Sequence, residues 1–564
     1  MNIPLLQVKN LSVDFGTANA VSNISFDVLP GELVAVVGES GSGKSVTSLS
    51  LLQLLPKQAM IKGELLFAKK NAPPINLLQS DEKSMRAIRG KDIAMIFQEP
   101  MTSLNPVFTC GYQVMEVIQL HQKVNAGIAK QKTIELFEKV KLPNPSQIIN
   151  RYPHELSGGQ KQRVMIAMAM SCNPSLLIAD EPTTALDVTV QKTILELIKE
   201  LQQQNGMSVI LVTHDLGLVA DIADKVVVMY KGEIVEQGNA MEVLRNPKDD
   251  YTKALLQCRP SLHEKGERLP VVGGQLSVIG DQLKEASEIK NSYAGTNKPI
   301  TVLELQNLKV HYPGKKTLFG KKHEPFKAVD GVGFAVSKGE TVGLVGESGC
   351  GKTTLGRAIL QLVPATAGKI ILNGKDLLQL SQKEITALRK DLQIVFQDPY
   401  GSLNPRITIG DAITEPMQVH EICNGKKERK DKVIELLEKV NLKTEHFNRY
   451  PHQFSGGQRQ RICIARALAL NPSFLIFDES VSALDVSVQA QVLNLLNDLK
   501  KEFQFTSIFI SHDLSVVRYI SDRIMVMQQG KIVEEGLADE IYFNSKHEYT
   551  RKLIDAVPGK KLAL

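Results

Sequence analysis

The chain lacks the features of a secreted or membrane-spanning protein. Its six cysteines are scattered without a C-x-x-C pair, at Cys110, Cys172, Cys258, Cys350, Cys423 and Cys463. Such usage fits a reducing compartment and provides neither a disulfide framework nor a zinc site. The first residues lack the basic segment and apolar core of a secretory signal, and no apolar stretch approaches the ~20 residues that a membrane-spanning helix requires. We therefore expect a cytosolic chain whose role at a membrane would need partner proteins.

An excess of charge of one sign is also lacking. The formal charge is +6 over 564 residues, with 43% hydrophobic and 23% charged residues, which is an ordinary soluble globular composition. A small positive charge is compatible with an anionic ligand or a membrane surface. It is far too weak to indicate nucleic acid, and we predict no nucleic-acid partner.

What the chain does contain is one set of phosphate-handling motifs, present twice in the same order. A G-x-x-x-x-G-K-S/T loop surrounds Lys44 and again Lys352. From a later S-G-G-Q segment onward, equivalent residues lie 298 positions apart, as do Ser157 and Ser455, Glu181 and Glu479, and His214 and His512. This constant offset indicates that a whole domain has been duplicated.

The repeat predicts two domains of about 250 residues, each within the usual range for one hydrophobic core. We place the first domain at residues 1–262, a connector rich in Gly, Ser, Lys and Glu at 263–299, and the second domain at 300–564. Insertions near residues 68–74 and 313–325 are expected to be surface loops, where extra residues cost little.

Short apolar runs without alternation come before the motifs, as in buried parallel strands. These runs are residues 33–37, 176–179 and 209–212 in the first copy and 341–345, 474–477 and 508–510 in the second. The motifs therefore lie at the carboxyl ends of strands, where α/β sheets bind ligands. The predicted fold class is α/β, with a mostly parallel sheet in each domain.

The glycine-rich loops have the composition of a phosphate cradle. They comprise Gly38, Glu39, Ser40, Gly41, Ser42, Gly43, Lys44 and Ser45, and Gly346, Glu347, Ser348, Gly349, Cys350, Gly351, Lys352 and Thr353. Glycines let successive N–H groups face the phosphates at the positive end of a helix. We expect Lys44 and Lys352 to reach the β- and γ-phosphates, and the hydroxyls of Ser45 and Thr353 to bind Mg²⁺. A chance loop does not account for two matches that each follow a strand.

Acidic pairs end two of the apolar runs, Asp180 with Glu181 and Asp478 with Glu479. We expect the aspartates to hold Mg²⁺, through water, and the glutamates to polarise the water that attacks the γ-phosphate. The alternative interpretation is a pair of acidic residues that cap a helix. The order of the motifs favours the catalytic role.

Two further polar positions recur between or after these motifs. Gln98 and Gln397 follow apolar runs, and their place between the glycine-rich loop and S-G-G-Q favours a contact with metal or water over a simple strand terminator. His214 and His512 follow strands in equivalent positions. This repetition favours a hydrogen bond to the γ-phosphate over a purely structural role.

The S-G-G-Q segments provide a second anion-binding element in each copy. They are Ser157, Gly158, Gly159 and Gln160, and Ser455, Gly456, Gly457 and Gln458. The serine can cap a helix, and the glycines expose backbone N–H groups at its positive end. Because the glycine-rich loop of the same domain already holds the phosphates, this element requires a phosphate from elsewhere.

Together these motifs resemble the ABC (ATP-binding cassette) ATPases over essentially the whole chain except the connector. The resemblance implies two tandem P-loop NTPase domains, each with a helical subdomain, that bind ATP and Mg²⁺ and hydrolyse ATP. It also implies that the domains pair head to tail within the chain. Lys44 would then face Ser455, and Lys352 would face Ser157.

The same resemblance assigns a role to two aromatic residues. Phe15 and Tyr312 lie ahead of the first strands and are similar in position to residues that stack on adenine in this family. Both copies keep their glutamate, Glu181 or Glu479, so both sites are expected to be hydrolytic.

A finer resemblance is to the ATPase subunits of bacterial oligopeptide and dipeptide importers. It rests on Q-E-P-M-T-S-L-N-P from Gln98, Q-D-P-Y-G-S-L-N-P from Gln397, and R-Y-P-H at 151–154 and 449–452. The two halves resemble the two subunit types of those systems, here fused. This implies two transmembrane permease subunits and a periplasmic or surface solute-binding protein as partners, and a peripheral location on the cytoplasmic side of the bacterial inner membrane. Many such subunits have a Cys-rich tail for an iron–sulfur cluster; Cys258 stands alone, so we predict no cluster.

Alternatives remain at this stage. One is a soluble tandem ABC protein that acts on ribosomes or nucleic acid; such proteins typically carry a long charged linker or zinc cysteines, which this chain does not have. A structural role without hydrolysis is disfavoured because no catalytic position is degraded. The solute stays open among dipeptide, longer peptide, glutathione, peptide antibiotic and, less favoured, nickel.

Overall fold

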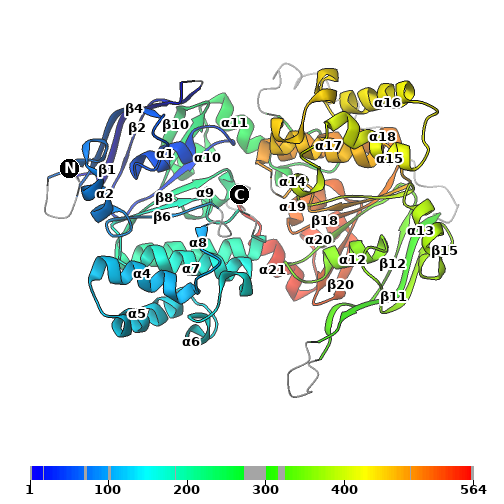
Figure 1. Ribbon diagram of the computed structural model, residues 1–564, viewed down its shortest axis with the longest axis horizontal. Helices are drawn as coiled ribbons and strands as arrows, with labels where there is room; N and C mark the ends of the chain where they lie inside the picture. The colour runs from blue at the N-terminus through cyan, green and yellow to red at the C-terminus, as the bar shows by residue number, and fades with distance from the viewer. Residues whose placement is uncertain are drawn as a thin grey trace. The chain divides into compact units, whose positions relative to one another are not determined.

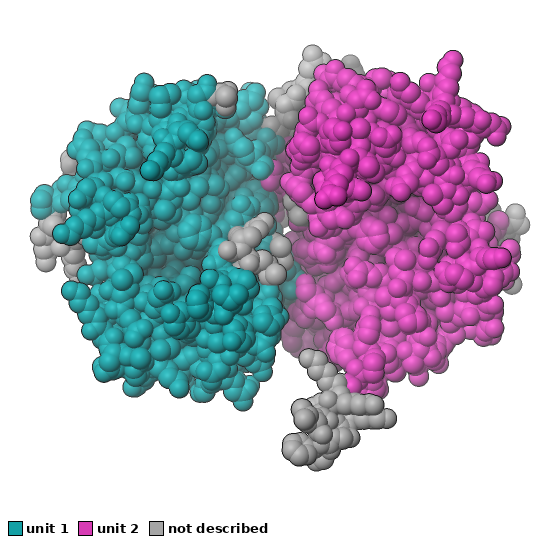
Figure 2. Space-filling model, in the orientation of Figure 1, with its two compact units in different colours: residues 1–256, 558–564 teal, residues 257–557 magenta. Residues whose placement is uncertain are grey.

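The computed structural model contains two compact units (Figures 1 and 2). Unit 1 comprises residues 1–256 and 558–564, and unit 2 comprises residues 257–557. The structure describes residues 3–16, 18–68, 73–98, 103–184, 186–271, 300–314, 324–482 and 484–559. Outside this set lie most of the predicted connector, parts of both predicted insertion loops and the residues directly after Gln98, namely 272–299, 69–72, 315–323 and 99–102.

The main sheet of unit 1 has the strand order β10-β9-β3-β8-β7-β6 and is parallel except for β10. Its strands are β3 (Leu33–Val37), β6 (Ile93–Ile96), β7 (Leu176–Asp180), β8 (Ser208–Thr213), β9 (Lys225–Tyr230) and β10 (Glu233–Asn239). Every residue of β3, β7 and β8 is buried. A strand that is buried on both faces needs apolar side chains throughout, which explains the continuous apolar runs.

One face of this sheet shares a core with a smaller antiparallel sheet of order β2-β1-β4-β5. Its strands are β1 (Leu6–Asp14), β2 (Asn19–Val28), β4 (Met60–Phe67) and β5 (Ile75–Asn76). Buried residues alternate with more exposed ones along β1 and β2, because only one face of this sheet packs on the core.

The other face of the main sheet packs against helices, and α4, α5 and α7 share its core as a helical subdomain. The helices of unit 1 and of the segment that follows it are α1 (Lys44–Leu51), η1 (Leu77–Gln79), α2 (Glu82–Ile88), α4 (Cys110–Gln122), α5 (Ala126–Lys139), α6 (Pro145–Ile148), η2 (Pro153–Glu155), α7 (Gly158–Met170), α8 (Val188–Asn205), α9 (Leu216–Ile222), α10 (Ala240–Arg245), α11 (Asp250–Gln257) and η3 (Pro260–Leu262).

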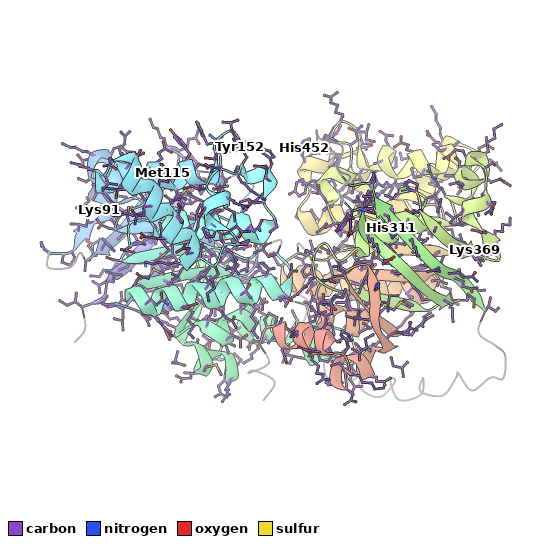
Figure 3. The ribbon with its side chains drawn as sticks, turned by 90° about the horizontal axis from the view of Figure 1, so that it is seen from below. Lys91, Met115, Tyr152, His311, Lys369 and His452 are labelled. Atoms are coloured by element: carbon purple, nitrogen blue, oxygen red, sulfur yellow. The ribbon has the colours of Figure 1, made fainter. Side chains whose placement is uncertain are left out.

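Unit 2 repeats this architecture. Its main sheet has the order β16-β17-β18-β13-β19-β20, parallel except for β20, and its antiparallel sheet has the order β12-β11-β14-β15. The strands are β11 (Thr301–Tyr312), β12 (Phe326–Ser337), β13 (Thr341–Val345), β14 (Ala367–Leu372), β15 (Lys375–Asp376), β16 (Leu392–Val395), β17 (Phe474–Asp478), β18 (Thr506–Ser511), β19 (Arg523–Gln528) and β20 (Lys531–Leu537). Figure 3 labels His311 on β11 and Lys369 on β14 of the antiparallel sheet.

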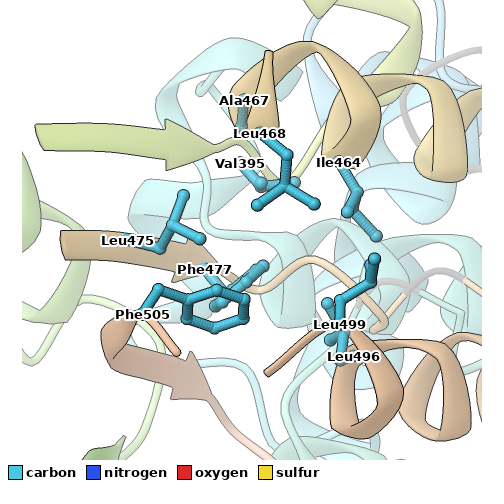
Figure 4. A pocket seen from close by; sticks show the side chains of 9 residues that line it. All are labelled: Val395, Ile464, Ala467, Leu468, Leu475, Phe477, Leu496, Leu499 and Phe505. Atoms are coloured by element: carbon cyan, nitrogen blue, oxygen red, sulfur yellow. The ribbon is translucent and has the colours of Figure 1, made fainter. Parts of the chain in front are cut away.

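The helices of unit 2 also follow the order of unit 1. They are α12 (Lys352–Ile359), η5 (Leu377–Gln379), α13 (Gln382–Leu388), α14 (Pro399–Ser402), α15 (Ile409–Val419), α16 (Lys426–Lys439), η6 (Thr444–Asn448), η7 (Pro451–Gln453), α17 (Gly456–Leu468), α18 (Val486–Phe503), α19 (Leu514–Ile520), α20 (Ala538–Phe543) and α21 (Glu548–Ala556). Side chains of α17, α18 and the sheet, among them Phe477, Leu496 and Phe505, meet in the core (Figure 4). The space between them is too small for a water molecule.

The predicted α/β class, with a mostly parallel sheet and a helical subdomain in each half, is confirmed. Residues 263–271, predicted as the start of the connector, are part of unit 2. In the described part of the chain, no helix combines the length and apolarity needed to cross a bilayer.

Candidate functional site

The glycine-rich loops join β3 to α1 and β13 to α12, at the carboxyl ends of the central strands. Gly43 and Gly351, which precede the two helices, have φ values of 97° and 112°. A Cβ at Gly38 or at Gly346 would lie 2.2 Å from a backbone oxygen of β9 or β19. Only glycine fits these positions. The backbone of each loop is therefore curled tightly at the start of a helix, as a phosphate cradle requires.

The lysine of each loop is held inside this curve. Nζ of Lys44 donates to the carbonyl oxygens of Gly38 and Glu39, both at 2.8 Å. In the second copy, Nζ of Lys352 donates to the equivalent carbonyls at 2.6 and 3.0 Å. The two lysines are only 5% and 4% exposed. Each ammonium group is thus fixed within the concave side of its loop.

The hydroxyl group after each lysine contacts the aspartate at the end of a neighbouring strand. Ser45 Oγ donates to Asp180 Oδ1 at 3.1 Å, and Thr353 Oγ1 donates to Asp478 Oδ1 at 2.9 Å. Burial raises the pKa of Asp180 to about 6 and also raises the pKa of Asp478. A cation beside these carboxyls would offset the cost of burying their charge. The structure thus brings together the hydroxyl and carboxyl groups that were predicted to hold Mg²⁺.

The predicted catalytic glutamate of the first copy accepts several contacts on one oxygen. Oε2 of Glu181 lies 3.1 Å from Gln98 Nε2, 2.9 Å from Thr184 Oγ1 and 3.4 Å from His214 Nδ1. Burial alone would raise the pKa of Glu181. The hydrogen bond and charge of His214, with the Thr184 hydroxyl and Lys44, outweigh burial and lower the pKa to about 2. The carboxylate is therefore ionised at neutral pH and held in one orientation.

The second copy repeats this arrangement with one difference. Glu479 Oε2 lies 2.8 Å from Gln397 Nε2 and 3.5 Å from His512 Nδ1. Burial opposes the effect of His512, but the net result is again a lowered pKa for Glu479. Ser482, which replaces Thr184, donates to the backbone carbonyl of Glu479 and not to the carboxylate. The first carboxylate is therefore held by one more hydrogen bond than the second.

Both glutamates also have strained backbones. Glu181 has a φ of 45° and Glu479 a φ of 47°, in the left-handed region that residues other than glycine rarely adopt. Each glutamate N–H donates to a carbonyl of the neighbouring strand, from Val212 or Ile510, at 2.9 Å. From this backbone conformation, the side chain of each glutamate contacts the glutamine and the histidine of its site. Strain of this kind is concentrated at functional sites.

The S-G-G-Q segments start helices α7 and α17. Ser157 Oγ accepts from Gln160 N at 3.3 Å, and Gln160 Oε1 accepts from Ser157 N at 3.1 Å, which is a capping box. Ser455 and Gln458 form the same pair. A Cβ at the second glycine, Gly159 or Gly457, would clash with a valine of the next long helix. A Cβ at Gly456, the first glycine of the second segment, would meet no atom within 4 Å. At Gly158, a Cβ would lie 3.3 Å from Leu186 Cδ2. The first glycine therefore leaves the helix start open in the second segment, whereas the second glycine packs in both.

The next two residues, Tyr312 and Phe15, were predicted to contact adenine. Tyr312 ends β11, is 41% exposed and lies opposite Phe326 in the sheet. A cavity of about 320 Å³ is lined by the second glycine-rich loop, Gln397, Glu479 and Phe326, but Tyr312 does not line it. Phe15 packs partly against the core of unit 1. Phe326 is thus a candidate that sequence reasoning missed. One feature could have pointed to it: Phe326 lies two positions before Ala328, and the carbonyl of Ala328 lies against Gly351 of the phosphate loop.

A tyrosine near the end of each repeat also contacts the phosphate loop. The hydroxyl of Tyr251 in α11 accepts from Glu39 N at 3.0 Å, and that of Tyr549 in α21 accepts from Glu347 N at 2.9 Å. The sequence shows these tyrosines as matching positions, but their contact spans more than 200 residues and has no local signal. Each tyrosine hydroxyl thus holds the backbone of a glycine-rich loop that the sequence identifies.

Comparison with known proteins assigns the family. The ABC transporter family matches residues 21–184 and 329–482, and the family described as oligopeptide/dipeptide transporter, C-terminal region, matches 235–285 and 533–561. The chain belongs to the ABC transporter family. Proteins named glutathione import ATP-binding protein are 47% identical in Pectobacterium atrosepticum and 48% identical in Salmonella choleraesuis, each over 98% of this chain and 89% of the relative.

Two solved structures are also similar to this chain. One is a dimeric ATP-binding cassette in a post-hydrolysis state with ADP and Pi, with 30% identity and a TM-score of 0.38 over 42% of this chain and 98% of that one. The other, from Clostridium perfringens, is described as part of an ABC transporter complex, with 25% identity and a TM-score of 0.38 over 43% of this chain and 92% of that one.

The family assignment confirms the prediction of an ATP-hydrolysing subunit of a peptide-type ABC importer. It does not favour the soluble alternative on ribosomes or nucleic acid. A component of this kind binds ATP and works with membrane permeases and a solute-binding protein. The roles predicted for individual site residues stay predictions, which the geometry above supports to different degrees.

Proposed function

We propose that this chain drives the import of glutathione or a closely similar short peptide by hydrolysing ATP–Mg²⁺ at two sites. The observation that carries the proposal is the identity of 47–48% over nearly the whole length with proteins named for glutathione import. Both copies also retain the complete set of lysine, hydroxyl, aspartate, glutamine, glutamate and histidine.

The residues present fit a divalent cation bound with the triphosphate. The hydroxyl groups of Ser45 and Thr353 lie against Asp180 and Asp478, and Gln98 and Gln397 lie at the same edge of the sheet; these six residues would hold Mg²⁺. The buried aspartates with raised pKa values form a donor set that a cation would satisfy. Bound Mg²⁺ would neutralise charge that develops on the phosphates.

The chain's own residues position the water and the phosphates. Glu181, ionised because of its lowered pKa, accepts a proton from the attacking water or orients it, while the amide of Gln98 keeps its carboxylate in place. His214, which lies beside Glu181, would donate to the γ-phosphate. Glu479, Gln397 and His512 do the same in the second site.

Each triphosphate would be completed by the S-G-G-Q helix start of the other half, in head-to-tail pairing within the chain. Ser157 and Ser455 are exposed at the starts of their helices, and Gly158 is exposed beside Ser157. A helix start with this geometry attracts an anion. The phosphate loop of the same unit already has its own helix for this purpose, which supports an acceptor in the other unit.

The partners would be two permease subunits, contacted on the cytoplasmic side of the bacterial inner membrane. Apolar side chains that follow Gln98 in the sequence support this surface in unit 1. Val107 is 70% exposed, and Phe108 and Tyr112 stack with ring centroids 5.0 Å apart. Exposed apolar residues that follow the glutamine would let a permease movement reach the site.

The test is transport by the purified complex in proteoliposomes, with the two permeases and the solute-binding protein. We expect ATP-dependent uptake of labelled glutathione that is lost in the double variant Glu181→Gln, Glu479→Gln. The matched control is Glu233→Gln, an exposed glutamate on β10. Uptake of a dipeptide or longer peptide but not of glutathione would reject the solute and keep the ATPase assignment. Glutathione uptake by the double variant would reject the mechanism.

A further inference from the structure

The chain that leaves the first copy becomes part of unit 2 before the undescribed residues begin. Residues 258–270, here called the docking segment, belong to unit 2, and η3 within it lies against α19. Cys258 and Leu269 are 0% and 1% exposed and are members of the unit 2 core. The Cys258 thiol donates to the carbonyl of Pro270, which closes the segment into a loop.

One side chain of α18 holds the backbone of the segment by both of its polar groups. Asn494 Oδ1 accepts from Leu269 N at 2.9 Å, and Asn494 Nδ2 donates to Leu269 O at 2.8 Å. Asn494 is 5% exposed. Asn494 Oδ1 also accepts from the Tyr519 hydroxyl at 3.3 Å, so without the segment the buried Nδ2 group would lose its partner, which is costly. The surface of unit 2 is therefore adapted to an occupant.

Further contacts extend along the segment. Tyr519 of α19 donates from its hydroxyl to the carbonyl of Glu267 at 2.6 Å. Lys265 pairs with Asp522, and Arg268 pairs with Asp498 at 3.2 Å. The docking segment thus contacts α18, α19 and the start of β19 through apolar packing, backbone hydrogen bonds and opposite charges.

The first copy cannot hold such a segment in the same way. Counted by the offset of 298, Asn494 corresponds to Glu196 and Tyr519 to Asp221. An ionised carboxylate accepts but does not donate, so Glu196 cannot bind both groups of a peptide unit. Asp221 instead accepts from Gly559 N at 3.2 Å, within the short stretch at residues 558–559 that belongs to unit 1. The surface that binds residues 258–270 is therefore specific to unit 2.

We propose that residues 258–270 are a docking peptide by which the first half binds the second ATPase domain at all stages of the nucleotide cycle. The contact involves none of the residues that line the nucleotide sites, so it persists when ATP is absent. Covalent continuity through residues 272–299 is then not needed to keep the halves together. The occupant of the surface is this segment and not a permease.

The test is to cut the chain after it has folded. A protease recognition sequence is inserted between Lys284 and Glu285, the purified full-length protein is cleaved, and its mass is measured by native mass spectrometry without ATP or Mg²⁺. We expect the two fragments to remain one complex. In Leu269→Asp, a charge replaces the buried side chain, and association of the fragments weakens by at least about 100-fold.

The matched control is Leu262→Asp, which places the same charge in the same segment at a leucine that is 46% exposed. The cleaved control stays associated. ATPase activity of uncut Leu269→Asp shows that both domains are folded, and Asn494→Ala repeats the effect from the other side of the contact. Fragments of the unchanged protein that separate without nucleotide, or cleaved Leu269→Asp fragments that stay together, would overturn the proposal.

The same samples distinguish this proposal from head-to-tail pairing. A triple variant combines Leu269→Asp with Glu181→Gln and Glu479→Gln, so that it binds ATP without hydrolysing it. If head-to-tail pairing occurs, ATP rejoins the cleaved fragments of this variant. If ATP has no such effect while the unchanged cleaved protein stays associated, the docking segment is supported and the pairing scheme fails.

Discussion

Gln98 donates a hydrogen bond of 3.1 Å from Nε2 to Oε2 of Glu181, although 83 residues separate them in the chain. Gln397 and Glu479 repeat the contact at 2.8 Å. The glutamine follows an outer strand of the main sheet, whereas the glutamate follows the strand beside it. A displacement of Gln98 would therefore reach the carboxylate directly.

Both glutamates are expected to support hydrolysis. We predict that Glu181→Gln and Glu479→Gln each lower ATP turnover by about half or more, because each removes the base at one site, and that the double variant loses more than about 100-fold. The measurement is phosphate release at saturating ATP–Mg²⁺. Normal turnover in Glu181→Gln together with complete loss in Glu479→Gln would contradict two hydrolytic sites.

Adenine contacts can be distinguished by fluorescence because the chain contains no tryptophan. We predict that Phe326→Trp changes emission on ATP binding, since Phe326 lines the cavity beside the phosphate loop. Tyr312→Trp and Phe15→Trp test the two positions inferred from the family. A response from Trp at position 312 but not at 326 would show that the cavity lining does not mark the adenine position.

The two glycines of the second S-G-G-Q segment should respond differently to alanine. A Cβ at Gly457 would lie 2.3 Å from Val488 Cγ1, whereas a Cβ at Gly456 has nothing within 4 Å. Because the valine is β-branched and stiff, Gly457→Ala should lower the free energy of unfolding by about 1–3 kcal/mol. Gly456→Ala should leave the free energy of unfolding unchanged. Urea denaturation of both variants measures the difference. Equal losses in both variants would refute the packing argument.

The tyrosine after each repeat should affect nucleotide affinity. Tyr251→Phe removes the hydroxyl that accepts from the N–H of Glu39 in the phosphate loop. We expect weaker ATP binding by about 5-fold, the effect of about 1 kcal/mol for one hydrogen bond. Equilibrium binding of a fluorescent ATP analogue measures it. The control is Tyr230→Phe, which keeps the ring stacked on Tyr251 at 4.2 Å and removes a hydroxyl other than the one bonded to Glu39 N; a similar loss there would show that the bond to Glu39 is not the cause.

Acid should weaken unit 2 through Asp522. Burial opposes its ionisation, but the charges of Lys265 and Lys500, the Lys265 hydrogen bond and the N–H of Thr341 together lower its pKa. A lowered aspartate pKa stabilises the fold above the unfolded value of about 3.9, and this stability is lost as pH falls through the folded pKa. We predict that Asp522→Asn flattens the fall in urea midpoint below about pH 4. Asp498→Asn removes an exposed ion pair and is the control for the loss of a carboxylate; an equal flattening there would contradict the role of Asp522.

Much of each nucleotide site could be predicted because its signals are local. The run at 33–37 coincides with β3, and Ser157 and Gln160 form the capping box that starts α7. The adenine position was harder, since Phe326 follows a stretch whose length differs between the copies. The tyrosine contacts were not predictable, because Tyr251 and Glu39 are 212 residues apart.

By itself, the sequence determined a duplicated α/β ATPase and predicted its phosphate, metal and catalytic residues, because strand patterns, helix caps and glycine loops depend on neighbours in the chain. Only the tertiary structure decided that residues 263–271, which follow the first copy, are part of unit 2. Composition identified that stretch as a polar connector. Within the described residues of that stretch, the buried Leu269 meets Asn494 across 225 residues, and that distance conceals the contact from any local pattern.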